Sequence, residues 1–177
     1  MSRYFGEIFQ LAYVVEDLEA ACRHWSKTLG VGPFYRFPLP LPFDTVAVRG
    51  ENLPLDVDIF RGVAVSYSGD MMIELIEPGS AASPYREFLA AGRKGVHHVG
   101  TFATDYDNQL AQAKAAGITV AFEGKLPLSR FAYLDTDALY PGTMVEMIDP
   151  SQIMLDLFAE IKAAAKNWDG QNPIRDM

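Results

Sequence analysis

The sequence predicts an α+β fold made of two βαβββ modules, with curved mixed sheets that pair side by side. Two short patterns, each of which occurs twice in the chain, support this prediction. A β-rich run that leads into an acidic helix start occurs at residues 10–18 and again at 98–106. A strand that ends in proline occurs at 73–78 and again at 145–150. Because both halves open with the first pattern and close with the second, chance is a poor explanation for the repeat.

The repeat divides the chain, which we expect to form a single domain over residues 1–177. The expected parts are a first module over 7–78, a linker over 79–95, a second module over 96–150, and a C-terminal helix and tail over 151–177. Asp17 is a typical N-cap, and Gly30 lies where the helix that follows Asp17 is expected to end. Proline cannot donate to a ladder hydrogen bond, so the Pro-rich residues 38–42 are expected to form a loop or a sheet edge.

The hydrophobic pattern and the turn residues predict the individual elements within these bounds. Helices are expected at about 17–29, 85–91, 105–116 and 152–166, the last with Ile153, Leu157 and Ile161 on one apolar stripe. Strands are expected near 7–15, 33–37, 55–67, 71–77, 96–104, 118–124, 130–135 and 143–149. The residues from about Asn167 onward are polar, and we expect them to form a tail on the surface or against a partner.

Composition and charge exclude several classes of protein. The formal net charge is −8, and excess carboxylate repels phosphate backbones and anionic lipid, so we expect no nucleic-acid or membrane partner. Cys22 is the single cysteine of the chain, which excludes an intrachain disulfide. No segment approaches the roughly 20 apolar residues that a membrane-spanning helix needs. The N-terminal residues do not resemble a signal peptide, and we expect a cytoplasmic protein.

Two glutamates in the expected closing strands point to a functional site. Glu74 lies between Met72 and Ile76 on one strand face, and Glu146 lies at the equivalent place in the second half. A carboxylate among apolar neighbours is expensive to bury unless something neutralises it. A single glutamate of this kind more often faces water from a one-sided sheet. Its recurrence at the same place in both halves favours a shared role.

The opening strands add two polar residues at equivalent positions, His98 in the second half and Gln10 in the first. A lone strand histidine is more often a hydrogen-bonded core residue than a ligand. If the two halves pair by pseudo-twofold symmetry, however, Gln10, Glu74, His98 and Glu146 converge on a common axis. The sequence therefore predicts a metal-binding cup between the sheets. A set of N and O ligands with two carboxylates suits Zn, Co, Ni, Mn or Fe(II).

Five segments of the sequence form a recognisable set: Gln10-Leu-Ala-Tyr-Val-Val-Glu-Asp-Leu, Leu29-Gly-Val-Gly-Pro-Phe34, Gly69-Asp-Met-Met-Ile-Glu-Leu-Ile-Glu-Pro78, His97-His98-Val-Gly and Phe131-Ala-Tyr-Leu-Asp-Thr136. On these segments the chain resembles the vicinal oxygen chelate superfamily of glyoxalase I, methylmalonyl-CoA epimerase, extradiol dioxygenases and bleomycin-resistance proteins. It is most similar to the epimerase and glyoxalase I branch. The resemblance implies metal ligands at Glu74, His98 and Glu146, with His97 on the opposite face. The remaining ligand, a histidine in the family, falls on Gln10, a weaker neutral ligand.

The resemblance also implies a chemistry and a substrate class. A divalent metal would polarise a carbonyl and stabilise an enolate, while Glu146 or Glu74 removes the adjacent proton. Epimerase, isomerase and lyase outcomes share this step, and a CoA thioester or a small oxo-acid is the expected substrate. From the residues themselves, the candidates for substrate binding are Phe34, Tyr67, Tyr133, Tyr140 and either Arg130 or Arg49. Residues 38–43 are expected to form either a lid over the cup or a plain edge loop.

Two other functions stay open at this point. A non-catalytic small-molecule-binding protein of the resistance type could use the same cup, although such proteins typically lack the ligand set. An extradiol-type dioxygenase normally uses two histidines and one glutamate on Fe(II), and Gln10 stands where one of those histidines is needed. The expected sheet edges and the apolar stripe of the C-terminal helix, together with the resemblance, predict a homodimer.

Overall fold

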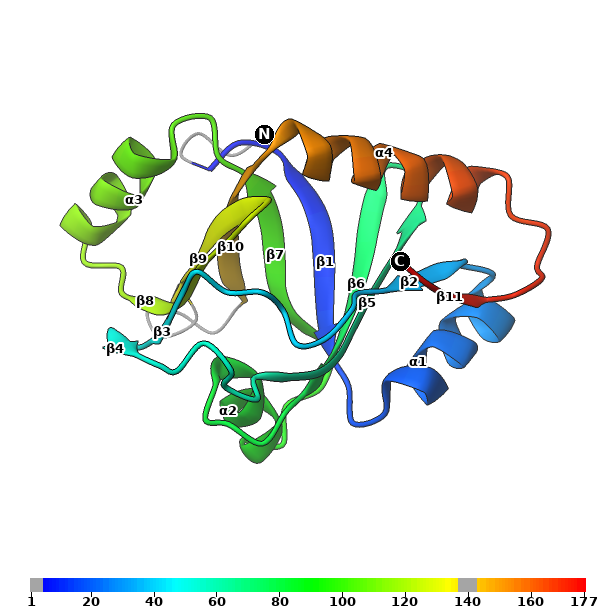
Figure 1. The fold of residues 1–177 in the computed structure, drawn as a ribbon, viewed down its shortest axis with the longest axis horizontal. Coiled ribbons are helices and arrows are strands. Elements are labelled where there is room, and N and C mark those ends of the chain that lie inside the picture. Colours follow the sequence, from blue (N-terminus) through cyan, green and yellow to red (C-terminus); the bar gives the residue numbers. More distant parts are fainter. Residues whose placement is uncertain (1–4, 137–142) are drawn as a thin grey trace.

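A computed structural model describes residues 5–136 and 143–177 and contains one continuous curved sheet (Figure 1). Its strand order is β11-β2-β5-β6-β1-β7-β10-β9-β8-β3-β4, with parallel and antiparallel pairs. This is the mixed α+β fold that the sequence predicts. The strands are β1 Ile8–Val14, β2 Phe34–Arg36, β3 Thr45–Val48, β4 Glu51–Asn52, β5 Phe60–Ser68, β6 Met71–Pro78, β7 Val96–Phe102, β8 Val120–Leu126, β9 Ser129–Leu134, β10 Met144–Pro150 and β11 Ile174–Asp176.

The centre of the sheet has approximate twofold symmetry. β1 and β7 pair antiparallel, and each has a parallel partner from its own half of the chain, β6 and β10 respectively. In these parallel pairs Glu74 lies opposite Ala12, and Glu146 lies opposite Gly100, two residues beyond Gln10 and His98. Gln10 is therefore equivalent to His98, and Glu74 to Glu146, as the repeat requires. The exact residue bounds of the two modules and the linker stay predictions.

Each helix begins at a side chain that caps its first backbone amides. The helices are α1 Leu18–His24, which continues as a π-helical turn over Trp25–Leu29, α2 Pro84–Ala90, α3 Tyr106–Ala115 and α4 Gln152–Lys166. The Asp17 carboxylate accepts from the Ala20 amide at 2.8 Å, as the sequence predicts. Ser83, Asp105 and Ser151 cap α2, α3 and α4 in the same way. Gly30 closes the first helix with a φ of 68°, a left-handed conformation that favours glycine.

The helices cover the outer side of the sheet and one of its open ends (Figure 1). α1 buries Leu18 and Cys22 against β5 and β6 of the first half, and α3 packs against β10 of the second. α4 lies across β5 and β10 and buries Phe158 and Ile161. The largest apolar cluster lies on the concave side, where rings such as Phe122 and Phe131 meet. The concave side is therefore lined mostly by apolar side chains.

The chain between β2 and β3 crosses in front of the sheet from one half to the other (Figure 1). β2 pairs with β5, whereas β3 pairs with β8 in the second half. Strands β3 and β4 are additions to the predicted elements. β3 pairs with β8, about 75 residues further along the chain, and β4 pairs with β3, so no local pattern reveals either strand. The Pro-rich residues 38–42 lie in this crossing segment and form no strand, as predicted.

One expectation for the C-terminal region was wrong in detail. Ile153 is 65% exposed, so the buried stripe of α4 includes the expected Ile161 and also Phe158, but not Ile153. The polar tail packs on the chain itself, because β11 adds to the sheet edge in parallel with β2. An ion pair of 2.7 Å between Arg36 and Asp176 ties the two strands together. Since the apolar stripe of α4 is used within the chain, a homodimer rests on the resemblance and the sheet edges, and stays a prediction.

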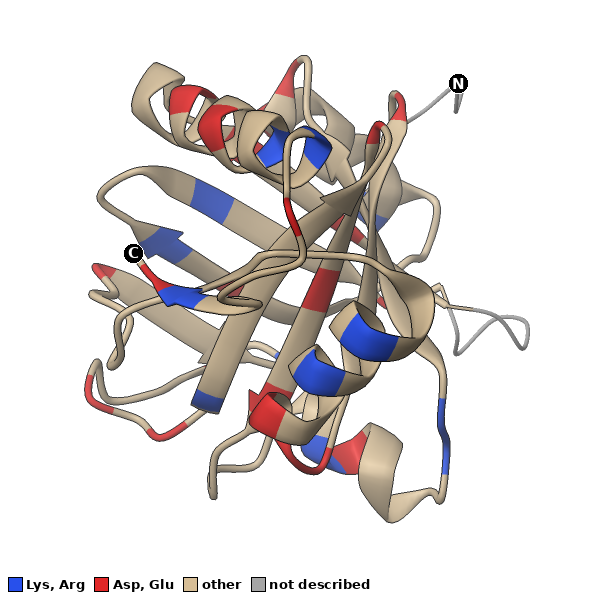
Figure 2. Cartoon of the chain, turned by 90° about the vertical axis from the view of Figure 1, so that its right-hand side faces the viewer, with Lys and Arg blue, Asp and Glu red and all other residues tan. Residues whose placement is uncertain are grey.

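Charged residues are spread over helices, turns and strand ends, with both signs on α4 (Figure 2). Lys162 of α4, for example, pairs with Asp70 of the β5–β6 turn at 2.9 Å. In the part of the chain that the structure describes, no helix is long and apolar enough to cross a membrane.

Candidate metal centre

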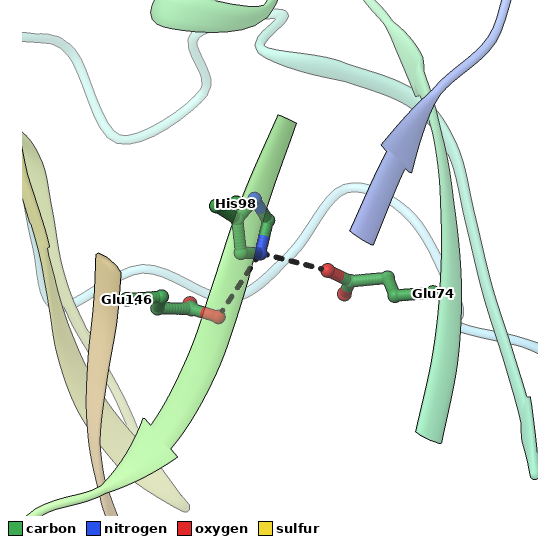
Figure 3. A group of neighbouring side chains, drawn as sticks. All are labelled: Glu74, His98 and Glu146. Atoms are coloured by element: carbon green, nitrogen blue, oxygen red, sulfur yellow. Dashed lines mark ion pairs between the residues drawn. The ribbon is translucent and has the colours of Figure 1, made fainter. Parts of the chain in front are cut away.

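Three ligand-type side chains converge on the concave side of the sheet (Figure 3). Glu74 comes from β6, His98 from β7 and Glu146 from β10. The Nε2 atom of His98 lies 3.3 Å from Glu74 Oε2 and 3.3 Å from Glu146 Oε2. One ligand atom from each residue lies within 4.8 Å of the others. The cluster thus joins the two halves of the sheet within a single chain, and it could hold a metal ion.

A β-bulge in β7 determines how His98 is oriented. Tyr13 of β1 pairs with Val96 and the preceding Ala12 pairs with His98, so His97 is an extra residue in β7. A bulge of this kind breaks the strict alternation of side chains. The expectation that His97 points to the opposite face is therefore wrong: its Nδ1 lies 3.0 Å from Nδ1 of His98. This contact to one ring nitrogen leaves the other, Nε2, directed at the two carboxylates.

Gln10 lies beside this cluster on β1 and is almost fully buried. Its Nε2 donates to the sulfur of Met72 at 3.3 Å, while its Oε1 has no hydrogen-bond partner among the described residues. A side chain at position 100 would collide with that oxygen, because a Cβ added to Gly100 would lie 2.2 Å from it. Glycine at position 100 therefore makes room for the Gln10 amide. That Gln10 is a ligand stays a prediction.

The unsatisfied atoms of the site provide a test of whether these residues fit a metal ion. Gln10 Oε1, Glu74 Oε2 and His98 Nε2 are all buried and lack a hydrogen-bond partner within the described part of the chain. Buried polar atoms in native proteins are normally hydrogen-bonded, and exceptions require an explanation. All three are atoms that donate electron pairs to divalent cations. The donor set therefore fits a bound divalent ion, whose identity it does not determine.

A chain of two tyrosine hydroxyls stands behind Glu146. Tyr85 of α2 donates its hydroxyl to that of Tyr133 of β9 at 2.7 Å, and Tyr133 lies beside the Glu146 carboxylate, whose pKa burial raises and this contact partly lowers. Burial, followed by the nearby Glu146, raises the pKa of both tyrosines well above the ordinary value, so both hydroxyls stay protonated donors. Tyr133 was predicted at the site, whereas Tyr85 was missed because it lies on the linker helix, far from the repeated strands.

The electrostatic state of the site follows from its burial. Burial lowers the pKa of His98, but the contacts with Glu146 and Glu74 outweigh it and raise the pKa to about 9. Burial also raises the pKa of the Glu146 carboxyl, against the effect of His98. Without a cation, His98 therefore carries a proton at neutral pH and balances the carboxylates. A divalent cation would replace that proton, because only a deprotonated ring nitrogen binds metal.

A cavity of about 460 Å³ opens over the centre. Gln10, Glu74, Tyr133 and Glu146 line its floor, and the Pro-rich segment, the β8–β9 turn and α4 line its walls. This volume lies within the range of small-molecule sites, about 300–1,000 Å³. The contribution of Pro38, Leu41 and Pro42 to the wall supports the lid interpretation of residues 38–43 rather than a plain edge loop.

The other residues expected to bind substrate lie away from this cavity, and these expectations are corrected. Phe34 is fully buried under α1, on the outer side of the sheet. Tyr67 packs under α4 with Phe158 and Ile161, and burial raises its pKa to about 12. Arg130 and Arg49 are held by carboxylates outside the cavity. Tyr140 lies outside the described residues. Strand parity explains Phe34 and Arg130, since neighbouring side chains point to opposite faces of a sheet. Tyr67 shares the face of Val63 and Val65 but is covered by α4.

Comparison with protein families identifies the superfamily of this chain. The family described as the Glyoxalase/Bleomycin resistance protein/Dioxygenase superfamily matches residues 9–133, most of the chain. The chain therefore belongs to this superfamily, as its sequence motifs predict. The matched region contains Gln10, Glu74 and His98 and ends before Glu146. No curated protein matches the chain.

Several solved structures share the fold. A hypothetical protein from Bacillus halodurans C-125 gives a TM-score of 0.59 at 15% identity, over 82% of this chain and 95% of that one. The methylmalonyl-CoA epimerase from Mycobacterium tuberculosis gives 0.60 at 14% identity, over 88% and 95%. A variant of the Streptomyces coelicolor methylmalonyl-CoA epimerase, in complex with 2-nitronate-propionyl-CoA, gives 0.57 at 17% identity, over 84% and 96%. At these identities the comparison shows a shared fold and no more.

Proposed function

We propose that this member of the superfamily is a metal-dependent epimerase or isomerase that removes a proton next to a carbonyl group. One observation carries the proposal: Glu74 and Glu146 line the floor of an apolar cavity, where they converge with the buried His98 and leave buried ligand atoms unsatisfied. A divalent cation held by these residues would polarise the substrate carbonyl and stabilise the charge of an enolate. A lyase would share this first step and differ only in the group that leaves.

The two carboxylates are the candidate proton carriers. Glu146 is buried and its pKa is raised, so it is a stronger base than an exposed glutamate and a suitable acceptor for a carbon-bound proton. When the C–H bond breaks, the proton passes to a carboxylate oxygen and the electron pair stays on the substrate as the enolate. Glu74 faces the same space from the first half of the sheet. Return of a proton from the opposite carboxylate gives the other epimer.

The hydroxyl of Tyr133 has a positioning role in this proposal. It lies beside the Glu146 carboxylate and is itself held by Tyr85, so it can keep that carboxylate in one orientation while its proton comes and goes. The ring of Tyr133 also lies 4.6 Å from the ring of His98, measured between centroids. Exclusion of water by the surrounding apolar wall strengthens each of these electrostatic contacts.

A non-catalytic binding protein is the second candidate, and the apolar cavity is the observation that favours it. Such a protein needs the cavity but has no use for Glu74 and Glu146 as a pair. An extradiol-type dioxygenase has weaker support, because Gln10 occupies the place of a required histidine. Metal analysis of the purified protein separates the first two candidates, since the binding protein would hold no divalent ion at this centre.

Exchange of substrate protons with deuterated solvent tests the proposal. Purified protein is supplied with Co, Zn or Mn and mixed with a panel of acyl-CoA thioesters and 2-oxo-acids, and deuterium next to the carbonyl is measured by mass spectrometry. Glu146→Gln should lower the exchange rate by about 10²- to 10⁴-fold, the usual contribution of a general base. The control Glu160→Gln, on the exposed side of α4, should exchange like the unaltered protein. Equal exchange in both variants would contradict the proposal.

A further inference from the structure

The polar groups of the cavity are gathered at one end. Gln10, Glu74, Tyr85, Tyr133 and Glu146 surround the metal centre, and the remaining wall is apolar apart from Ser129 in the β8–β9 turn. The apolar wall includes Phe37, Val65, Phe131, Leu157 and Phe158. Of the described residues that line the cavity, none is Lys, Arg or His. The cavity therefore provides ligand-type oxygen atoms at its floor and carbon surface elsewhere.

The cations next to cavity-lining residues in sequence are already held by other groups. Arg36 pairs with Asp176, Arg61 pairs with Glu77, and Arg86 donates to the backbone carbonyls of residues 78 and 79. Lys125 precedes the wall residue Leu126 and lies 3.9 Å from Asp44. Arg130 follows Ser129 and forms bonds of 2.8 Å to both Asp107 and Asp149. An anionic group of a ligand along the apolar wall would thus lose its hydration without gaining a counter-charge. That loss is unfavourable, and the two carboxylates at the floor add repulsion.

We infer that the substrate has an uncharged, apolar body of acyl, alicyclic or aryl type, which lies along the wall. Within the cavity, its anionic or chelating oxygens are confined to the end that meets Glu74 and Glu146, and the phosphates of a CoA thioester would lie outside the cavity. What we infer about the reacting end of the substrate rests on the proposed function. What we infer about its apolar body rests on the cavity alone. A substrate with a carboxylate or phosphate along the wall is excluded.

Two fluorescent probes test the apolar wall without any metal. N-phenyl-1-naphthylamine and 8-anilino-1-naphthalenesulfonate differ by a single sulfonate, and each is titrated into the metal-free protein. The uncharged probe should bind at least about tenfold more tightly, because burial of the sulfonate finds no cation. Leu128→Lys adds a cation at a lining residue that is 37% exposed, and should remove or reverse this preference.

The matched control for that variant is Ile153→Lys, a substitution on α4 at a position that is 65% exposed and does not line the cavity. It should leave the preference unchanged. If the sulfonate probe binds the unaltered protein as tightly as the uncharged probe, or if both lysine variants behave alike, the inference is overturned.

Two hydroxamates test the orientation of the ligand in the zinc-loaded protein. Octanohydroxamate and suberic acid monohydroxamate have the same chain length and the same chelating end, but the second ends in a carboxylate. Calorimetry should give octanohydroxamate a dissociation constant at least about tenfold lower. Equal constants would contradict the inference. Selective binding without any proton exchange would instead refute the proposed reaction and leave the inferred ligand class standing, so the two failures are distinguishable.

Discussion

The two halves of the sheet place ligand-type residues at equivalent positions but support them differently. In the second half, His97 contacts His98, and Tyr133 lies beside Glu146 with Tyr85 hydrogen-bonded behind it. In the first half, Gln10 donates to a methionine sulfur, a weak acceptor. Its amide oxygen has no hydrogen-bond partner within the described part of the chain. The symmetric backbone thus carries two well-supported side chains, His98 and Glu146, and one weakly supported side chain, Gln10.

This difference indicates which half of the site determines metal binding. Residues that contact a metal-ligating side chain on the side away from the metal fix the orientation of that side chain. They typically contribute 10- to 100-fold to metal affinity. Such contacts surround His98 and Glu146. Gln10 contributes a neutral amide, which binds more weakly than imidazole. We therefore expect the second half to hold the cation and the first half to adjust its affinity.

The largest effect is expected from the protonation of His98 in the metal-free protein. Its pKa in the folded chain is about 9, compared with 6.5 for an unperturbed histidine. A raised pKa stabilises the fold fully below pH 6.5, and this contribution is lost as the pH rises through about 9. The raised pKa of the Glu146 carboxyl also makes stability fall with rising pH, beginning from its ordinary value of 4.5. Denaturant unfolding should therefore give a free energy lower by about 3 kcal/mol at pH 9.5 than at pH 6.

Two histidine variants show whether this loss belongs to the site. His98→Gln should remove most of the pH dependence, whereas the control His24→Gln, on the exposed side of α1, should keep it. A stability that is constant or rises over this range in the unaltered metal-free protein would contradict the assignment of the proton to His98.

A smaller effect is expected from the tyrosine pair behind Glu146. Tyr133→Phe leaves the buried Tyr85 hydroxyl without its acceptor and should lower the unfolding free energy by about 1–3 kcal/mol. Tyr85→Phe removes one neutral hydrogen bond and should lower it by about 1 kcal/mol. The double variant should lose less than the sum, because the two hydroxyls act on each other. Additive losses in this double-mutant cycle would show that the second half lacks the coupled support described above.

The smallest effect is expected from making the two halves alike. Gln10→His gives the first half the imidazole that the second half already has at His98. Because imidazole is the stronger ligand for Zn, Co and Ni, the affinity for these ions should rise by about tenfold, provided that Gly100 still leaves room. Competition with a chromophoric chelator measures the change. An unchanged affinity would mean that position 10 lies outside the coordination sphere.

The sequence predicted the polar centre of the site better than its walls. Glu74, Glu146 and His98 were recognisable because each repeats a position of the other half, and the structure brings them together. Phe34 and Arg130 were placed wrongly, because a single sequence does not say which face of a strand becomes concave. His97 was placed wrongly because a bulge in β7 interrupts the alternation on which the prediction depended.

The fold class and most elements followed from local sequence patterns. The exceptions are strands that depend on a pairing partner far away in the sequence. The Asp17 cap, the Gly30 helix end and the span of α4 depend on neighbouring residues and agree with the structure. Strand β3 depends on a partner in β8, and β11 on a partner in β2. A short β-rich run becomes a strand only when a distant edge accepts it, and periodicity contains no such information.

A titration with Co²⁺ tests most directly the central claim that Glu74, His98 and Glu146 of one chain hold a divalent ion. The visible absorption of bound cobalt should saturate at one ion per chain. His98→Ala should weaken binding by more than about 100-fold, whereas Gln10→Ala should weaken it by less than about tenfold. If the unaltered protein binds no cobalt, or if His98→Ala binds it as tightly as the unaltered protein, the claim is wrong.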